Sequence, residues 1–155
     1  MALQSSILAT SIAPSGHLCS NSATLDKDAI VAFAARFDPQ PYHLDPDAAA
    51  QSIFGGLCAS GWHIAAVATR LITETLLDNG LPFIEMTSVS HLTWSRPSFV
   101  NEKISVRIGL GPSLTDSPIA GTHSQILEAD VCNDEGVVVA TMTATAAIAT
   151  DGAVP

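Results

Sequence analysis

The chain has 155 residues, a length that fits a single domain with a sizeable core. Charged residues make up only 14% of the chain and the net charge is −9, so neither nucleic acid nor an anionic membrane is expected as a partner. Such a low charge content indicates that part of the surface is covered in an oligomer or lines a long groove. A phosphate-bearing small ligand stays possible, because one or two local cations suffice to bind it.

The three cysteines, Cys19, Cys58 and Cys132, have neither metal-ligand nor CxxC spacing. An odd and sparse set is typical of reduced thiols inside the cell, which predicts a cytoplasmic protein. Residues 1–14 lack the basic start of a secretory signal, and no uninterrupted apolar run approaches the roughly 20 residues of a membrane span. We therefore expect no secretory signal and no membrane-spanning segment.

One domain is expected over residues 1–155. Residues 1–22 are rich in Ser, Ala and Gly, and we expect them, like residues 150–155, to be loosely ordered apart from a strand near Ser6–Ile12. The regular part of the chain then begins after residue 22.

A proline-rich segment follows the first predicted helix. Asp26 can cap a helix over Lys27–Arg36, which must end near Phe37 because a residue before proline avoids the helical region. The run Asp38-Pro39-Gln40-Pro41 predicts a stiff, extended turn, since each proline fixes its own φ and restricts the preceding residue. Such a turn can direct Asp38 and His43 into one space.

Two more helices are predicted before the first long strand. Asp45-Pro46 is typical of an N-cap followed by proline at the first helical position, and it opens a short helix through Gln51. After a loop over Ser52–Leu57, Ser60 can cap a longer helix over His63–Leu77. Because the first half of that helix is apolar nearly all round, we expect it to be buried on most sides.

The second half of the chain predicts strands joined by short turns. The simplest arrangement of these strands and the buried helix is an α+β fold in which an antiparallel sheet curls around a central helix. The predicted strands are Ile84–Trp94, Lys103–Leu110, Thr122–Cys132 and Val137–Thr150.

The central stretch holds a candidate catalytic pair. A carboxylate and an imidazole placed together, here Asp38 and His43, can share the transfer of a proton near neutral pH. Taken singly, Asp before proline is more often a turn former and a lone His is more often a satisfied polar residue. Gly61 stands where the buried helix begins, so its N–H has no intrahelical partner and can hold a carbonyl oxygen that gains negative charge. Together these groups suit the addition of water to a double bond conjugated with a carbonyl.

The stretch FDPQPYHLDPDAA followed by FGGLCASGW resembles the MaoC-like hydratase/dehydratase family, whose site motif is roughly D-x-N-P-x-H with a glycine downstream. The resemblance covers residues 24–110 well. It implies a hot-dog fold, a homodimer and no cofactor beyond the coenzyme A thioester of the substrate. The sequence departs from the family at Gln40, where Asn is usual, and at Ser60, where many hydratases have His.

The resemblance also implies roles for single residues. Asp38 and His43 take the positions of the catalytic pair and would activate a water that attacks C3 of a trans-2-enoyl thioester. Gly61 takes the position of the oxyanion donor. Thr69 falls where members often carry a serine that helps to order the site. The implied activity is that of an enoyl-CoA hydratase or 3-hydroxyacyl dehydratase that yields or consumes the (R)-3-hydroxyacyl thioester.

Further residues have two readings each. Ser60 is better explained as a helix cap than as a substrate ligand. A metal site is conceivable but lacks a known ligand spacing, so we expect none; its ligands would be His43, Asp45, Asp47 and His63. Four residues are candidate walls of an acyl pocket, with ordinary core packing as the alternative: Tyr42, Phe54, Trp62 and His63.

Two other functions stay open at this stage. The same fold and oxyanion donor would serve an acyl-CoA thioesterase, although the spacing of Asp38 and His43 matches the hydratases. A non-catalytic acyl-CoA-binding module would not need a proton-transfer pair. Under each reading the ligand is an acyl-CoA ester, with no nucleic acid and no membrane as partner.

Overall fold

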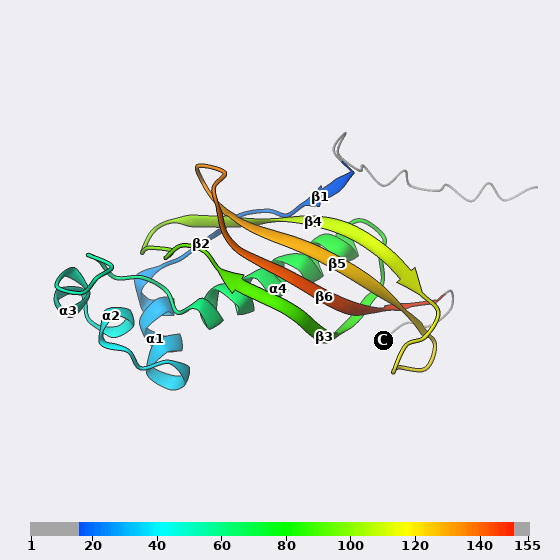
Figure 1. Ribbon diagram of the computed structural model, residues 1–155, viewed down its shortest axis with the longest axis horizontal. Helices are drawn as coiled ribbons and strands as arrows, with labels where there is room; N and C mark the ends of the chain where they lie inside the picture. Colours follow the sequence, from blue (N-terminus) through cyan, green and yellow to red (C-terminus); the bar gives the residue numbers. More distant parts are fainter. Residues whose placement is uncertain (1–15, 151–155) are drawn as a thin grey trace, which may run out of the picture.

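The computed structural model describes residues 16–150, in which a 6-stranded antiparallel sheet wraps around the helix α4, Gly61–Asp78 (Figure 1). The strand order is β1-β4-β5-β6-β3, with β2 also paired to β4. The α+β class and the hot-dog arrangement expected from the sequence are therefore confirmed. The strands are β1 His17–Cys19, β2 Ala23–Thr24, β3 Phe83–Trp94, β4 Lys103–Leu114, β5 Thr122–Asn133 and β6 Val138–Ala149.

Alternation along the long strands sets the two faces of the sheet. In β6, Met142, Ala144 and Ala146 are buried while the threonines between them are half-buried. This is the two-residue period of a strand with one face on the core. Gly136, with φ of 76°, closes the hairpin between β5 and β6, because a β-carbon would be strained there.

Helix α4 packs one stripe against the concave face of the sheet. Ser60 is its N-cap, and its side chain accepts a hydrogen bond from Trp62 N at 3.2 Å, as expected. The helix begins at Gly61, earlier than predicted. The first half of the helix was expected to be buried on most sides, and over residues 63–69 only Ala66 is exposed. Outside that half, Trp62 and Leu77 remain 59% and 51% exposed. The residues that α4 buries are His63, Ile64, Ala68, Leu71, Ile72, Thr75 and Leu76.

Three shorter helices gather at the end of the sheet where α4 begins (Figure 1). They are α1 Lys27–Phe37, α2 Pro41–Leu44 and α3 Pro46–Ala50. Asp26 and Asp45 cap α1 and α3 as predicted, through hydrogen bonds from Ala29 N and Asp47 N.

The proline-rich turn differs in part from its prediction. Gln40 is extended, with φ of −77° and ψ of 139°, but the chain turns helical at Pro41 and places His43 within α2. Proline at the first position of a helix is favourable, because its φ is already helical and its missing N–H would have had no partner. The bend is therefore extended through Gln40, as predicted, and becomes a short helix only from Pro41.

Strand β1 was not predicted from the sequence, and strand β4 is longer than predicted. The strand expected near Ser6–Ile12 lies outside the described residues. The prediction that the chain is loosely ordered up to residue 22 is wrong for His17–Cys19. This segment is a strand that pairs with β4 opposite Arg107–Gly109. Strand β4 runs on to Leu114 because a shift in register absorbs the irregular backbone between Leu110 and Ser113.

Candidate active site

Asp38 and His43 converge, as their positions in the sequence predicted. Asp38 Oδ2 lies 3.6 Å from His43 Nε2. Asp38 is the C-cap of α1 and His43 lies in α2, so the bend between the two helices brings them together. The His43 side chain is buried and the Asp38 side chain is 26% exposed. A carboxylate and an imidazole this close can act on the same proton.

A backbone carbonyl fixes the orientation of the imidazole. His43 Nδ1 lies 2.7 Å from Cys58 O. Because a carbonyl can only accept, the proton is assigned to Nδ1, which leaves Nε2 as the basic nitrogen in neutral His43. That nitrogen faces Asp38, so the two acceptors can each take a hydrogen from one water molecule.

Ser60 connects the carboxylate with the start of α4. Its hydroxyl donates to Asp38 Oδ2 at 2.7 Å and accepts from Trp62 N. Ser60 is fully buried, and both hydrogen bonds are internal to the protein. The prediction that Ser60 caps the helix is confirmed. A role of Ser60 in binding substrate stays a prediction, and in this structure its hydroxyl holds Asp38.

Gly61 presents the first backbone amide of α4. Its N–H has no acceptor within residues 16–150, and its carbonyl accepts from Trp94 Nε1 at 2.8 Å. The indole lies so close that a β-carbon on Gly61 would stand 2.7 Å from Trp94 Cε2. Only glycine fits here, and the absence of a side chain leaves the amide open. An N–H at the N-terminus of a helix can stabilise an oxyanion.

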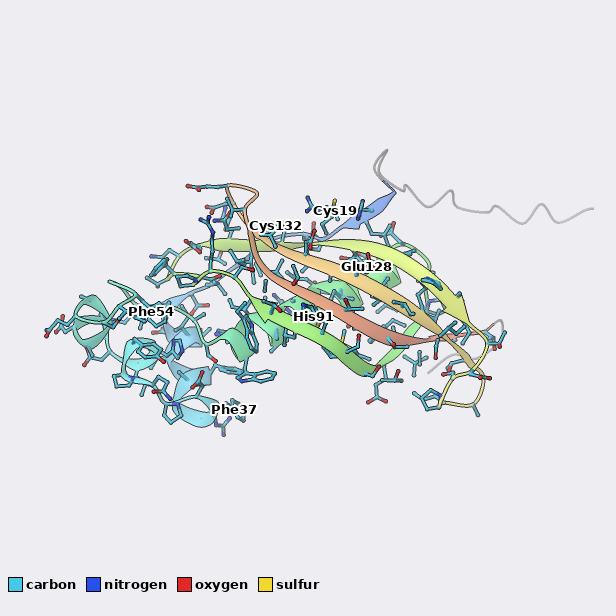
Figure 2. The ribbon with its side chains drawn as sticks, viewed as in Figure 1. Cys19, Phe37, Phe54, His91, Glu128 and Cys132 are labelled. Atoms are coloured by element: carbon cyan, nitrogen blue, oxygen red, sulfur yellow. The ribbon has the colours of Figure 1, made fainter. Side chains whose placement is uncertain are left out.

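A cavity of about 340 Å³ lies against these groups. His43 and Gly61 are in its wall. Asp38 is not a lining residue, but its Oδ2 lies 3.6 Å from Nε2 of the lining residue His43. Tyr42 and Phe54 line it as predicted, with their rings 4.9 Å apart (centroids), and Figure 2 shows Phe54 within the group of short helices. The other lining residues are Cys58, Ala59, Ile64, Trp94, Ser95, Arg96, Pro97, Ser98 and Val139.

Besides Asp38 and Ser60, three further residues predicted to belong to the site do not line this cavity. Trp62 and Thr69 line a separate groove between α4 and β3, and Thr69 donates its hydroxyl to Ala65 O at 2.9 Å. His63 stacks on Phe33 with ring centroids 4.8 Å apart. Residues on one helix point in different directions, so neither proximity in sequence to Gly61 nor, for Thr69, the family position places a side chain in the cavity. His63 is a buried residue of the helix interface, the alternative that the sequence left open.

Sequence reasoning missed the wall on the opposite side of the cavity. Trp94, Arg96 and Ser98 come from a segment that shows no chemical motif, and Cys58 was assigned no role although it lies in the stretch FGGLCASGW. They meet because Cys58 forms a β-bridge with Phe99, and Ala59 N donates to Ser98 O at 2.9 Å. Burial raises the pKa of the Cys58 thiol, so it is a neutral side chain and a poor nucleophile at neutral pH. The sequence carried no signal for this pairing.

The stability of the protein should fall on acidification because of His63. Burial lowers the pKa of this imidazole, and the nearby Asp26 carboxylate raises it by a smaller amount. Below about pH 6.5, the ordinary value for histidine, the unfolded chain binds a proton that the folded chain resists. The free energy of unfolding is therefore expected to decrease from about pH 6.5 downwards, through the lowered pKa. Urea unfolding from pH 8 to pH 5 measures this.

Two substitutions distinguish the contribution of His63 to the pH dependence of stability from that of other titrating groups. His63→Phe keeps the stacking on Phe33 and should flatten the decrease, whereas His91→Gln, at an exposed histidine, should retain it. Equal pH dependence in wild type and His63→Phe would contradict the assignment.

Two negative findings apply to residues 16–150 only. No helix there is long and apolar enough to cross a membrane. No three side chains among His, Cys, Asp and Glu are grouped there in a way that could hold a metal ion. Asp45, considered above as a ligand, is bonded to the backbone of α3 as its N-cap.

The fold and the site together define a class of protein. It is a hot-dog domain in which a carboxylate–imidazole pair and an open helix N-terminus meet at one cavity. A family model described as a MaoC like domain matches residues 13–112, and the chain belongs to this family.

Individual relatives agree with this assignment. The MaoC-like dehydratase of Rhodospirillum rubrum is 33% identical, with a TM-score of 0.74 over 88% of this chain and 92% of that one. The (R)-hydratase of A. caviae, involved in PHA biosynthesis, is 22% identical and shares the fold, with a TM-score of 0.66 over 84% and 92% of the two chains. The uncharacterized protein YdeM of Bacillus subtilis (strain 168) is 32% identical over 83 residues, or 54% of this chain. That match spans 58% of YdeM, less than two thirds of its length.

Proposed function

We propose that this protein adds water to a trans-2-enoyl thioester, with coenzyme A as the carrier, and gives the (R)-3-hydroxyacyl thioester or runs the reverse dehydration. The observation that carries the proposal is the contact of Asp38 Oδ2 with His43 Nε2 at 3.6 Å, beside the open amide of Gly61. Membership of a family that includes dehydratases supports the same reaction class.

The geometry supports a stepwise account of hydration. A water held between Asp38 Oδ2 and His43 Nε2 loses one proton to this pair while its oxygen forms a bond to C3 of the substrate. The electrons of the C2–C3 double bond move toward the thioester carbonyl, whose oxygen gains negative charge and is stabilised by the Gly61 N–H. A proton delivered by the pair to C2 restores the carbonyl. Asp38 and His43 act as a unit, so neither is assigned one proton alone.

Turnover of crotonyl-CoA tests the proposal directly. Hydration removes the absorbance of the conjugated enoyl thioester without releasing thiol. Chiral analysis of the product should give the (R) alcohol. Absorbance that falls with an equal release of coenzyme A thiol would instead establish a thioesterase. Tight binding of several acyl-CoA esters without any turnover would favour a binding module.

The active form is proposed to be a homodimer, with β3 at the interface. This strand of 12 residues is at the end of the strand order, so its outer side has no partner strand among residues 16–150. The uncovered face of α4 and β3 form a groove of about 490 Å³ whose lining carries no acidic or basic residue except His91, which Figure 2 shows on β3. An unpaired edge beside an apolar groove is suited to a second copy of the chain.

The dimer predicts a specific effect of charge in this groove. Val89 is 46% exposed on β3, and Val89→Lys should shift the protein from dimer to monomer in light scattering after size exclusion, because an unpaired charge would be buried. Leu114→Lys is the matched control, since Leu114 is 47% exposed on β4, away from the groove. A wild-type monomer, or a dimer unaffected by Val89→Lys, would contradict this interface.

The cellular setting stays a prediction from the sequence. The three cysteines are unpaired, which agrees with a reducing compartment such as the cytoplasm. No cofactor is required by the proposed reaction, because the acid–base pair and the backbone amide supply all its groups.

A further inference from the structure

Arg96 is the one cationic side chain in the wall of the cavity that contains His43. It follows β3, is exposed, and has no carboxylate within ion-pair distance among residues 16–150. The exposed arginines elsewhere include two that are paired, Arg70 with Glu74 at 3.9 Å and Arg107 with Asp130 at 2.7 Å. A cation without a carboxylate partner at the cavity is available to an anionic group of a ligand.

The charge distribution decides where that anion lies. With only six basic residues and a net charge of −9, the protein as a whole repels an anionic ligand. Asp38 places a carboxylate beside the inner cavity, where a second negative charge would be repelled at short range. The anion is therefore held outside the reacting part of the cavity, at the exposed guanidinium of Arg96.

Ser98 provides a second polar group on the same wall. It is 2% exposed, and its hydroxyl has no hydrogen-bond partner among the described residues. Its carbonyl accepts from Ala59 N, next to Cys58, whose carbonyl orients His43. A buried hydroxyl without a partner is costly, so a polar atom of a ligand is expected to bond to it. His43, Ser98 and Arg96 thus line one cavity.

We propose that Arg96 binds a phosphate of a phosphopantetheine thioester and that Ser98 bonds to an amide of its pantetheine arm. The inference depends on the proposed function, because it requires the thioester at Asp38 and His43. An arm that carries amides along its length and a phosphate at its far end matches a wall with a buried hydroxyl and an exposed guanidinium. Guanidinium also suits a phosphate in geometry and charge.

The test compares thioesters that differ only in the carrier. With crotonyl-CoA, Arg96→Gln should raise KM about tenfold and leave kcat unchanged, because the phosphate contact is the same in ground and transition states. With crotonyl-pantetheine, which has no phosphate, wild type and Arg96→Gln should have the same KM. Arg70→Gln removes an exposed arginine outside the cavity and should behave as wild type. Crotonyl-4′-phosphopantetheine then separates the two phosphate sources, since it retains only the phosphate shared with acyl carrier proteins.

Several outcomes would overturn the proposal. An unchanged KM of Arg96→Gln for crotonyl-CoA, or an equal change for crotonyl-pantetheine, excludes phosphate recognition. An effect confined to an enoyl-CoA with a terminal carboxylate would assign Arg96 to the acyl group. Ser98→Ala should raise KM severalfold for both crotonyl esters, and no change in either would remove Ser98 from the carrier site.

A binding measurement keeps this result separate from the proposed reaction. Calorimetric titration with coenzyme A itself should show about tenfold weaker binding to Arg96→Gln, while pantetheine binds both proteins alike. If wild type does not hydrate crotonyl-CoA but Arg96→Gln still weakens the binding of coenzyme A, the carrier site is supported and the proposed function is refuted. If wild type hydrates crotonyl-CoA but both proteins bind coenzyme A equally, the proposed function is supported and the carrier site is refuted.

Discussion

Asp38→Asn should lower kcat/KM for hydration of crotonyl-CoA by at least about a hundredfold in a protein that stays folded. Asparagine keeps the size of the side chain and an oxygen that can accept the 2.7 Å hydrogen bond from Ser60, but it cannot take a proton from water. His43→Ala should have an effect of similar size, because the two side chains act on the same proton. Steady-state kinetics and circular dichroism of each variant measure activity and folding.

A matched substitution controls for the loss of negative charge. Asp45→Asn removes a carboxylate from the same part of the chain but keeps the cap of α3, since Asn and Asp cap helices equally well. Its turnover should stay near that of wild type. Near-normal turnover in both Asp38→Asn and His43→Ala would refute the proposed mechanism. An equal loss in Asp45→Asn would show that the effect of Asp38→Asn is not specific.

Gly61→Ala is expected to cost about a hundredfold in kcat/KM, the usual effect of losing an oxyanion donor worth roughly 3 kcal/mol. The new β-carbon would lie 2.7 to 2.9 Å from three atoms of the Trp94 indole. Either the ring or the first turn of α4 must move, and both displace the Gly61 amide from its place in the cavity wall. The overpacking should also reduce the free energy of unfolding by about 1–3 kcal/mol. Kinetics and urea unfolding check the two effects.

Two comparisons attribute this loss to Trp94. Gly56→Ala is the control, because its β-carbon would lie 3.7 Å from Phe99 in ordinary van der Waals contact. In a Trp94→Ala background the clash is absent, so Gly61→Ala should there cost much less in stability than in wild type. The same cost in both backgrounds would exclude the indole as the cause.

Local sequence patterns were sufficient for much of this structure. The caps at Asp26, Asp45 and Ser60 and the alternation of β6 were predictable because each depends on residues close together in the chain. The pairing of Asp38 with His43 belongs to the same group, since the prolines restrict the few residues between them. The helical turn of α2 was missed because proline is compatible with both an extended bend and the start of a helix.

The remaining assignments depended on contacts between distant segments. His63 was given to the site from its nearness to Gly61 and Thr69 from the family resemblance, but the rotation of α4 carries both to other surfaces. Arg96 and Ser98 were overlooked because they reach the cavity only through the pairing of residues 98–100 with 57–59.

The sequence alone predicted the fold class and the meeting of Asp38 with His43, because hydrophobic period, capping and proline geometry act over a few residues. Only the tertiary structure decided which side chains face the cavity. From the sequence, the Ser60 hydroxyl could bind substrate or hydrogen-bond to Asp38. The fold brings Ser60 to Asp38, which lies 22 positions away in the chain, and forms that hydrogen bond. The reason is that burial and hydrogen-bond partners are set by packing between elements, which local propensity does not encode.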